Sequence, residues 1–232
     1  MTRPGGNARQ ALSRRIIDTC KAMNASGINQ GKSGNVSARF GDAMLITPSG
    51  VAYDALKPMD IVLQELDGVC APDQLLPSSE WRMHADIYRT RSEAQAIVHA
   101  HPTFCTALSC RREGIPAFHY MVAVAGGVDI RCSDYATFGT EDLSQTMIAA
   151  LDGRKACLLA NHGMICFDGD LDRALALAIE VESLARQYHH ACQGGTTIIL
   201  NDEQMADVLE KFKSYGRQPE GQGCSSPGHE RF

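Results

Sequence analysis

The sequence pattern predicts one α/β domain of three layers, in which helices cover both faces of a central, largely antiparallel sheet. Short apolar runs typical of strands lie in the middle of the 232-residue chain, with helical patterns before, between and after them. The turn Gly41-Asp42 separates two of these runs and is typical of a β-hairpin. The chain has no Gly-x-Gly-x-x-Gly pattern, which argues against a parallel dinucleotide-binding sheet.

The expected elements follow from the spacing of apolar side chains. The first is an amphipathic helix over residues 8–25, with apolar positions three or four apart. Strands are expected at residues 36–40, 44–47, 61–63, 95–98 and 157–160. Further helices are expected at residues 80–89, 103–109, 171–191 and 202–215. The longest of these is capped by Asp170, whose carboxylate suits a helix start.

Composition excludes several classes of protein. Hydrophobic residues make up 44% and charged residues 21%, as in ordinary globular proteins. A net charge of −5 without a basic stripe argues against nucleic-acid binding, and the apolar stretches are too short to cross a bilayer. The N-terminus has no hydrophobic signal core, and the nine cysteines include no Cys-x-x-Cys. We therefore expect reduced thiols and a cytoplasmic location, with neither nucleic acid nor membrane as partner.

Three histidines stand at the ends of two apolar runs. His99 and His101 follow the run 95–98 at a spacing that puts both side chains on one face of a strand, and His162 follows the run 157–160. Three imidazoles that leave further positions open are typical of a catalytic zinc ion, whereas structural sites more often contain cysteine. We expect a catalytic divalent metal here, with zinc as the ion that three imidazoles favour.

Three polar loops rich in hydrogen-bond donors accompany these histidines, at residues 32–35, 47–50 and 78–80. Each alone is typical of an ordinary turn or helix N-cap. Beside a metal they indicate a phosphorylated substrate, because hydroxyls and first-turn N–H groups bind phosphate. His84 and His119 receive no role from the pattern.

The motifs resemble, in order, those of the class II aldolases in the fuculose-phosphate aldolase and ribulose-phosphate epimerase superfamily. The resemblance covers nearly all of the chain up to Tyr215. It rests on residues 29–31, 34–37, 45–50, 77–81, 99–101, 119–121, 135–140, 161–163 and 210–216. It implies an aldolase domain over residues 1–216, followed by the Gly-, Pro-, Gln- and Ser-rich tail 217–232, which we expect to be disordered.

This resemblance implies an activity and an assembly. The chain would cleave a ketose 1-phosphate of the L-fuculose 1-phosphate type into dihydroxyacetone phosphate and a short aldehyde of the lactaldehyde type. Zinc, one ion per subunit, would take the place of a lysine Schiff base. The expected assembly is a homotetramer with active sites at subunit interfaces.

The resemblance also implies roles for single residues. Glu80 would bind zinc with His99, His101 and His162, and would then leave the ion to act as the proton-transferring base. Tyr120 would protonate the aldehyde half from a neighbouring subunit. The implied phosphate ligands are Gly34, Asn35, Ser49, Gly50, Ser78 and Ser79. The implied aldehyde pocket is lined by Phe138 and Tyr215.

Three alternatives stay open at the level of sequence. A salvage aldolase for 5-deoxyribulose 1-phosphate or 5-methylthioribulose 1-phosphate would use the same machinery. A phosphosugar epimerase or decarboxylase is a second alternative, although the epimerases carry aspartate where this chain has Glu80. The third alternative is a non-catalytic module such as the adducin head, which resembles this fold but lacks the metal ligands. Lys32 and Ser49 depart from the pattern of the aldolases, and we expect Lys32 to point to solvent.

Overall fold

The computed structural model describes residues 5–214, and six strands within them form one antiparallel sheet in the order β3-β2-β1-β4-β6-β5. The strands are β1 (Asn35–Phe40), β2 (Ala43–Ile46), β3 (Val62–Glu65), β4 (Ala96–Ala100), β5 (Ala156–Leu159) and β6 (Gly163–Asp168). The helices are α1 (Gly6–Ala25), α2 (Trp81–Thr90), α3 (Thr103–Cys110), α4 (Glu141–Ala150), α5 (Leu171–Gln193) and α6 (Asp202–Phe212). Three short 3₁₀ turns complete the described elements: η1 (Tyr53–Ala55), η2 (Pro58–Asp60) and η3 (Tyr120–Ala125).

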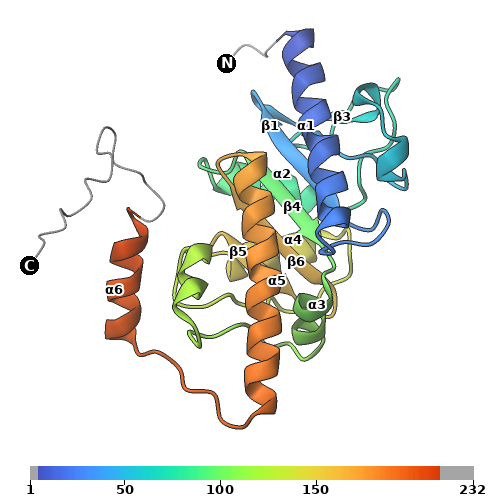
Figure 1. Ribbon diagram of the computed structural model, residues 1–232. Coiled ribbons are helices and arrows are strands. Elements are labelled where there is room, and N and C mark those ends of the chain that lie inside the picture. Colours follow the sequence, from blue (N-terminus) through green and yellow to red (C-terminus); the bar gives the residue numbers. More distant parts are fainter. Residues whose placement is uncertain (1–4, 215–232) are drawn as a thin grey trace, which may run out of the picture.

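Helices cover both faces of the sheet, as the sequence predicts (Figure 1). One hydrophobic core joins the sheet to α1, α3 and α5, and a second joins its other face to α2 and α4. Along β4 the two cores alternate: Val98 belongs to the first, whereas Ile97 belongs to the second. Because side chains alternate across a strand, His99 points toward the layer that contains α2.

The helix boundaries follow from local capping. The side chain of Asp170 accepts a hydrogen bond from the Arg173 backbone at 2.8 Å, so the predicted N-cap of α5 is confirmed. Asn201 and Gln204 form a reciprocal capping box at the start of α6. The α6 helix packs on η3 through the buried side chain of Met205.

Several expected elements are confirmed, and five were not predicted. The hairpin across Gly41-Asp42 is present, with Phe40 opposite Ala43. The unpredicted elements are β6, α4 and the three 3₁₀ turns η1, η2 and η3. β6 is buried on both faces and therefore lacks the alternation that marks a half-exposed strand. The last helix ends at Phe212, whereas Tyr215 and the predicted tail lie outside the described residues.

No helix between residues 5 and 214 combines the length and the apolar character that crossing a membrane would require. The eight cysteines in this part of the chain are all free thiols. Four of them are buried, namely Cys20, Cys105, Cys157 and Cys166.

The start of β6 leaves no room for a side chain, and this gives a test of the fold. A Cβ atom on Gly163 would lie 2.5 Å from the Ala100 carbonyl oxygen and 2.7 Å from Cδ2 of His101. Gly163→Ala is therefore expected to lower the free energy of unfolding by about 2 kcal/mol, the usual cost of overpacking. Urea unfolding measures the change. Gly169→Ala is the control, because its Cβ would meet only Arg173 at 3.8 Å; equal stability of the two variants would contradict the predicted clash.

Candidate metal centre

Strand pairing brings the three predicted histidines together. β4 lies antiparallel beside β6, with His99 opposite Ile165, so the end of β4 meets the beginning of β6. His101 is the first residue after β4, and His162 lies in the turn that leads from β5 into β6. Glu80 is the N-cap residue of α2, which covers the same face of the sheet. The sheet and one helix start therefore supply the four side chains.

The four side chains form one compact cluster. Their potential ligand atoms all lie within 4.8 Å of one another. His99 Nε2 lies 3.1 Å from His101 Nε2 and 3.1 Å from Glu80 Oε2. The second carboxylate oxygen, Glu80 Oε1, lies 3.1 Å from His162 Nε2. This set of three imidazoles and one carboxylate is one that a divalent ion such as zinc accepts.

The hydrogen bonds around the cluster fit a metal ion. His99 Nδ1 donates to the Met164 carbonyl oxygen at 2.8 Å, so the lone pair of the ring is on Nε2 and faces the cluster. Glu80 Oε1 is buried and has no hydrogen-bond partner within residues 5–214. A buried acceptor without a donor and facing imidazole lone pairs are costly unless a cation lies between them. The residues present therefore fit a metal.

Electrostatics holds Glu80 and His101 in the protonation states that bind metal. Burial alone would raise the pKa of Glu80, but His99 and His162 outweigh it and hold the pKa well below its usual range. Burial and the neighbouring rings of His99 and His162 lower the pKa of His101 to about 4. A carboxylate and a neutral imidazole are the ligand forms of these residues.

His84, which the sequence pattern left without a role, lies directly behind the cluster. Its Nε2 is 2.6 Å from Asn35 Oδ1, and Asn35 Nδ2 donates to Glu80 Oε2 at 3.0 Å. Its Nδ1 is 2.7 Å from Ser37 Oγ. The available signal was position: His84 is one helical turn after Glu80, on the buried face of α2. His119 instead caps η3, where its Nδ1 accepts from the Met121 backbone.

The three predicted phosphate loops lie side by side. The Ser49 backbone donates to the Leu76 carbonyl, and the Ser78 backbone donates to the Thr47 carbonyl, both at 3.0 Å. Lys32 is exposed, but its Nζ also donates to the Gly50 carbonyl oxygen at 2.7 Å. Thus Lys32 links two of the loops rather than only pointing to solvent.

Not every predicted phosphate ligand has a free donor. The Ser49 and Ser79 side chains are exposed. The Gly34 backbone donates to Asn29 Oδ1 at 3.0 Å, and both ends of the Asn35 amide bond to buried partners. Ser78 is buried, and its hydroxyl accepts from the Glu80 backbone at 3.3 Å. Phosphate binding by Gly34 or Asn35 would require these internal bonds to be exchanged.

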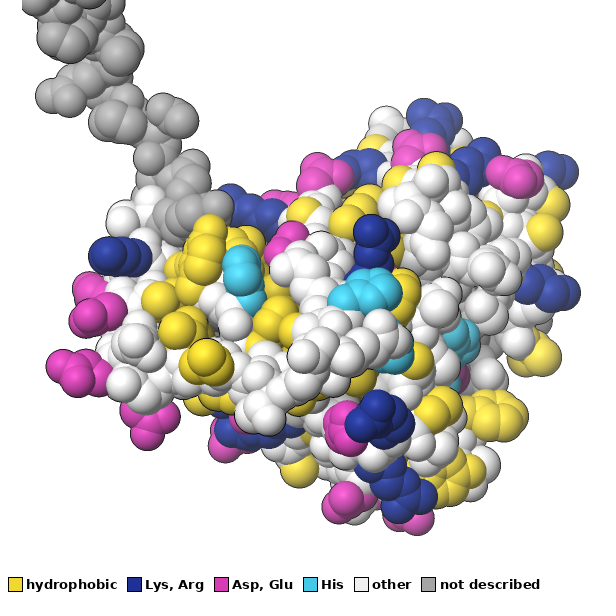
Figure 2. Space-filling model, turned by 60° about the horizontal axis from the view of Figure 1, so that its bottom comes forward, with side chains coloured by type: hydrophobic (Ala, Val, Ile, Leu, Met, Phe, Trp, Pro, Cys, Tyr) yellow, Lys and Arg dark blue, Asp and Glu magenta, His cyan; other side chains and the backbone are white. Residues whose placement is uncertain are grey.

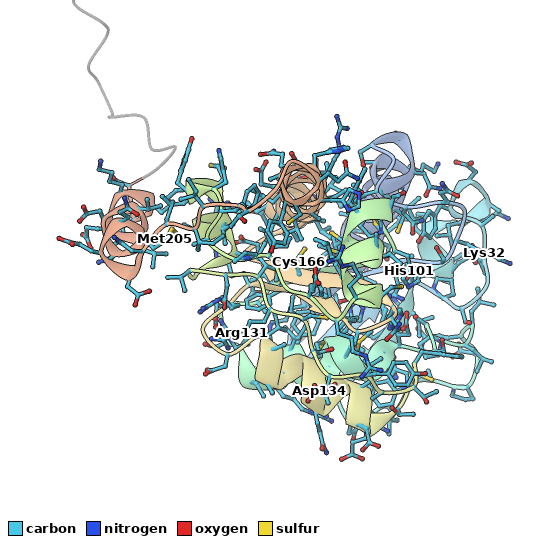
Figure 3. The ribbon with its side chains drawn as sticks, turned by 90° about the horizontal axis from the view of Figure 1, so that it is seen from below. Lys32, His101, Arg131, Asp134, Cys166 and Met205 are labelled. Carbon is cyan, nitrogen blue, oxygen red and sulfur yellow. The ribbon has the colours of Figure 1, made fainter. Side chains whose placement is uncertain are left out.

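A cavity of about 460 Å³ opens on the cluster. Its lining includes Glu80, His101 and His162 together with Ser33, Ser79, Tyr135, Ala136, Phe138 and Asn161. Phe138 therefore lies at the mouth of this cavity, 65% exposed. In Figure 3, His101 lies beside α3, and Lys32 lies at the outer edge on the same side of the molecule.

Two predicted site residues lie elsewhere. Tyr120 is in η3, is half-exposed and does not belong to the lining of this cavity. Tyr215 falls outside the described residues. Asn161 belongs to the motif 161–163 but received no role of its own from the sequence; its backbone adopts a left-handed φ of 54° immediately before His162. A non-glycine residue in this region is strained and often belongs to a functional turn.

Comparison with known proteins gives a consistent result. Residues 14–189 match the family model described as the class II aldolase and adducin N-terminal domain. A 5-methylthioribulose-1-phosphate/5-deoxyribulose-1-phosphate aldolase of Rhodospirillum rubrum is 50% identical over 209 residues, which cover 90% of this chain and 94% of that one. The L-fuculose phosphate aldolase of Escherichia coli K12 is 49% identical over 209 residues, with coverage of 90% and 97%. A solved L-fuculose 1-phosphate aldolase superposes with a TM-score of 0.85 at 39% identity, covering 91% of this chain and 98% of that one.

The cluster predicts a direct effect of removing one imidazole. His162→Ala is expected to weaken metal binding by more than about 100-fold, because the loss of a ligand exceeds the loss of an outer hydrogen bond. Metal content after dialysis and competition with a chelator measure the change. His190→Ala, at the exposed end of α5, is the control and should retain the metal. Full metal content in His162→Ala would remove this residue from the ligand set.

Burial of His84 predicts how stability depends on pH. Burial lowers the pKa of His84 to about 3, against about 6.5 in the unfolded chain. Between these values the unfolded state binds more protons, so stability decreases as the pH falls. From pH 7 to pH 5 the metal-free protein should lose about 2 kcal/mol through this residue. Urea unfolding should show a smaller loss for His84→Gln, and parallel profiles of the two proteins would contradict the assignment.

Proposed function

Because this chain belongs to the class II aldolase and adducin N-terminal domain family and is a lyase of the aldolase type, we propose that it cleaves a ketose 1-phosphate to dihydroxyacetone phosphate and a short aldehyde. The observation that carries the proposal is the complete cluster of Glu80 and three histidines beside three donor-rich loops. A non-catalytic member of the family would have no need for four converging metal ligands.

We propose zinc as the metal, held by Glu80, His99, His101 and His162. Three imidazoles with one carboxylate favour zinc over harder ions such as magnesium. When bound, such an ion would act as a Lewis acid that polarises the ketone of the substrate. The Met164 carbonyl keeps the His99 ring in the tautomer that this role requires.

Glu80 is the proposed base. Its carboxylate is ionised, belongs to the lining of the cavity and comes from a helix start rather than from the sheet. With a metal held by the three histidines, Glu80 would be free to move a proton to or from the carbon beside the ketone of the bound substrate. The reverse transfer restores the carboxylate, so no other oxidant or cosubstrate is needed.

The substrate phosphate is proposed to bind between the loops 47–50 and 76–80. The Ser49 and Ser79 hydroxyls face solvent there, and Gly50 and Ser78 belong to the same paired backbone. Lys32 adds a positive charge beside Gly50. Gly34 and Asn35 lie on the inner side of this site, next to the metal ligands.

The aldehyde end is proposed to involve a second subunit. Phe138 borders the cavity, whereas Tyr120 is exposed on η3 and is free to reach the site of a neighbour in a homotetramer. Ile198 and Ile199, which precede α6, are exposed, and Figure 2 shows hydrophobic side chains on the surface at the side where α6 lies. Such a patch suits contact with another copy of the chain. Tyr215 is proposed to border the same pocket.

Two kinds of substrate are supported to a similar degree. Relatives at 49% and 50% identity are named for L-fuculose phosphate and for 5-methylthioribulose 1-phosphate or 5-deoxyribulose 1-phosphate. Both reactions release dihydroxyacetone phosphate and differ only in the aldehyde. Comparison of kcat/KM for these sugars is the measurement that separates them.

The shared half-reaction tests the proposal without a choice of aldehyde. In heavy water the zinc-loaded protein should exchange one hydroxymethyl proton of dihydroxyacetone phosphate stereospecifically, as followed by NMR. Glu80→Gln should retain zinc through three imidazoles but slow the exchange by about 10²- to 10⁴-fold, the range for loss of a general base. Protein stripped of metal is the negative control. An absence of exchange by the zinc-loaded protein would favour an epimerase, a decarboxylase or a binding module.

Mixed assemblies test the role of Tyr120. Tyr120→Phe should lower turnover by about 100-fold, as expected for loss of a proton donor. If Tyr120 acts in the neighbouring site, co-assembly of Tyr120→Phe with Glu80→Gln subunits restores activity, because some sites then combine an intact Glu80 with an intact Tyr120. Activity that never exceeds the sum of the two separate variants would place Tyr120 in its own subunit's site or outside the mechanism.

A further inference from the structure

A line of buried polar side chains leads from Tyr88, in the last turn of α2, to the carboxylate of Glu80. Its members are Tyr88, Ser37, His84, Asn35 and Glu80, which we term the Tyr88–Glu80 network. Each is at most 6% exposed, and His84 and Ser37 are fully buried. Apolar residues of the second core surround it, among them Met83, Ile87 and Ile97. Polar groups are costly in such a place unless every one of them is paired.

The hydrogen bonds of this network have a fixed direction. Glu80 Oε2 can only accept, so Asn35 presents its NH₂ group at 3.0 Å. That leaves Asn35 Oδ1, also an acceptor, facing His84, so the proton of the ring must be on Nε2. Full burial lowers the pKa of His84, and the neutral ring therefore accepts at Nδ1.

The far end of the network follows in the same way. Ser37 Oγ donates to His84 Nδ1 at 2.7 Å, which leaves the serine oxygen to accept from the Tyr88 hydroxyl at 2.9 Å. The guanidinium of Arg39 lies 4.8 Å from the centre of the Tyr88 ring and donates to the Tyr88 carbonyl. All four hydrogen bonds thus point toward Glu80, an arrangement in which each bond strengthens the next.

We propose that His84 is a positioning residue for Glu80: by donating from Nε2 to Asn35, it holds the Asn35 amide in the one orientation that donates to the carboxylate. The inference rests on the proposed function, in which Glu80 is both metal ligand and base. A rotated Asn35 would direct its oxygen at Glu80 Oε2, only 3.1 Å from His99 Nε2, and would repel the carboxylate from the metal position.

Two amide substitutions separate this role from simple filling of the core. The amide of glutamine reaches the position of Nε2, so His84→Gln keeps the donor to Asn35. The shorter asparagine reaches only the position of Nδ1, so His84→Asn keeps the partner of Ser37 and loses the donor to Asn35. Both variants replace the ring by one buried amide. A purely structural role predicts that zinc affinity and kcat are similar in the two variants, whereas the positioning role predicts a clear difference.

The experiment measures zinc affinity by chelator competition, together with kcat, KM and thermal unfolding, for the unchanged protein and both variants. His84→Asn is expected to bind zinc about 10- to 100-fold more weakly, the usual effect of losing an outer partner of a metal ligand. Its kcat should decrease more than its KM increases. His84→Gln should stay close to the unchanged protein in zinc affinity and kcat. Equal zinc affinity and kcat in His84→Asn and the unchanged protein, or equal losses in both variants, would overturn the inference.

A measurement without any variant covers the case in which neither variant folds. In ¹⁵N-labelled, metal-free protein, NMR should show His84 as the neutral Nε2–H tautomer at pH 5.5. An Nδ1–H tautomer would overturn the inference. These results are distinguishable from failure of the proposed function, in which the unchanged protein would bind no zinc and would not exchange protons on dihydroxyacetone phosphate.

Discussion

Burial removes the Glu80 carboxylate from water, so its charge depends on the Asn35 amide that donates to it and on a positive charge, from a proton or a metal ion, among the imidazoles that face its oxygens. The arrangement depends on every partner, since an unpaired buried charge costs several kcal/mol. The same charge orients the Asn35 amide. This amide in turn orients His84 and the other polar side chains under α2. The metal position, the proposed base and the packing of this face therefore all depend on the same buried charge.

The sheet and its turns hold the histidines in place. His99 is held by pairing of β4 with both β1 and β6, and its ring is held by the Met164 carbonyl. His162 depends on the turn before β6, in which Asn161 has a left-handed backbone. The close approach of Gly163 to Ala100 brings this turn against the end of β4. Backbone contacts, rather than side-chain contacts alone, determine how the imidazoles converge.

Much of this arrangement could be predicted from the sequence. Four features follow from residues that are close together in the sequence. They are the antiparallel sheet, the hairpin, the cap at Asp170 and the grouping of the histidines. β6 could not be recognised, because a strand buried on both faces has no alternation. His84 was missed for another reason: its partners Ser37 and Asn35 come from β1, and no local pattern reports a contact across more than 45 residues.

Three of the four candidate ligands come from the sheet or its turns, whereas Glu80 is the N-cap residue of α2 and is preceded by a partly exposed loop. Local opening of a loop and one helix end costs much less free energy than opening of a central strand. An ion at this site would thus have a route to solvent in which one ligand swings away while three remain in place. Metal exchange would consequently be a separate process from global unfolding, with a different barrier.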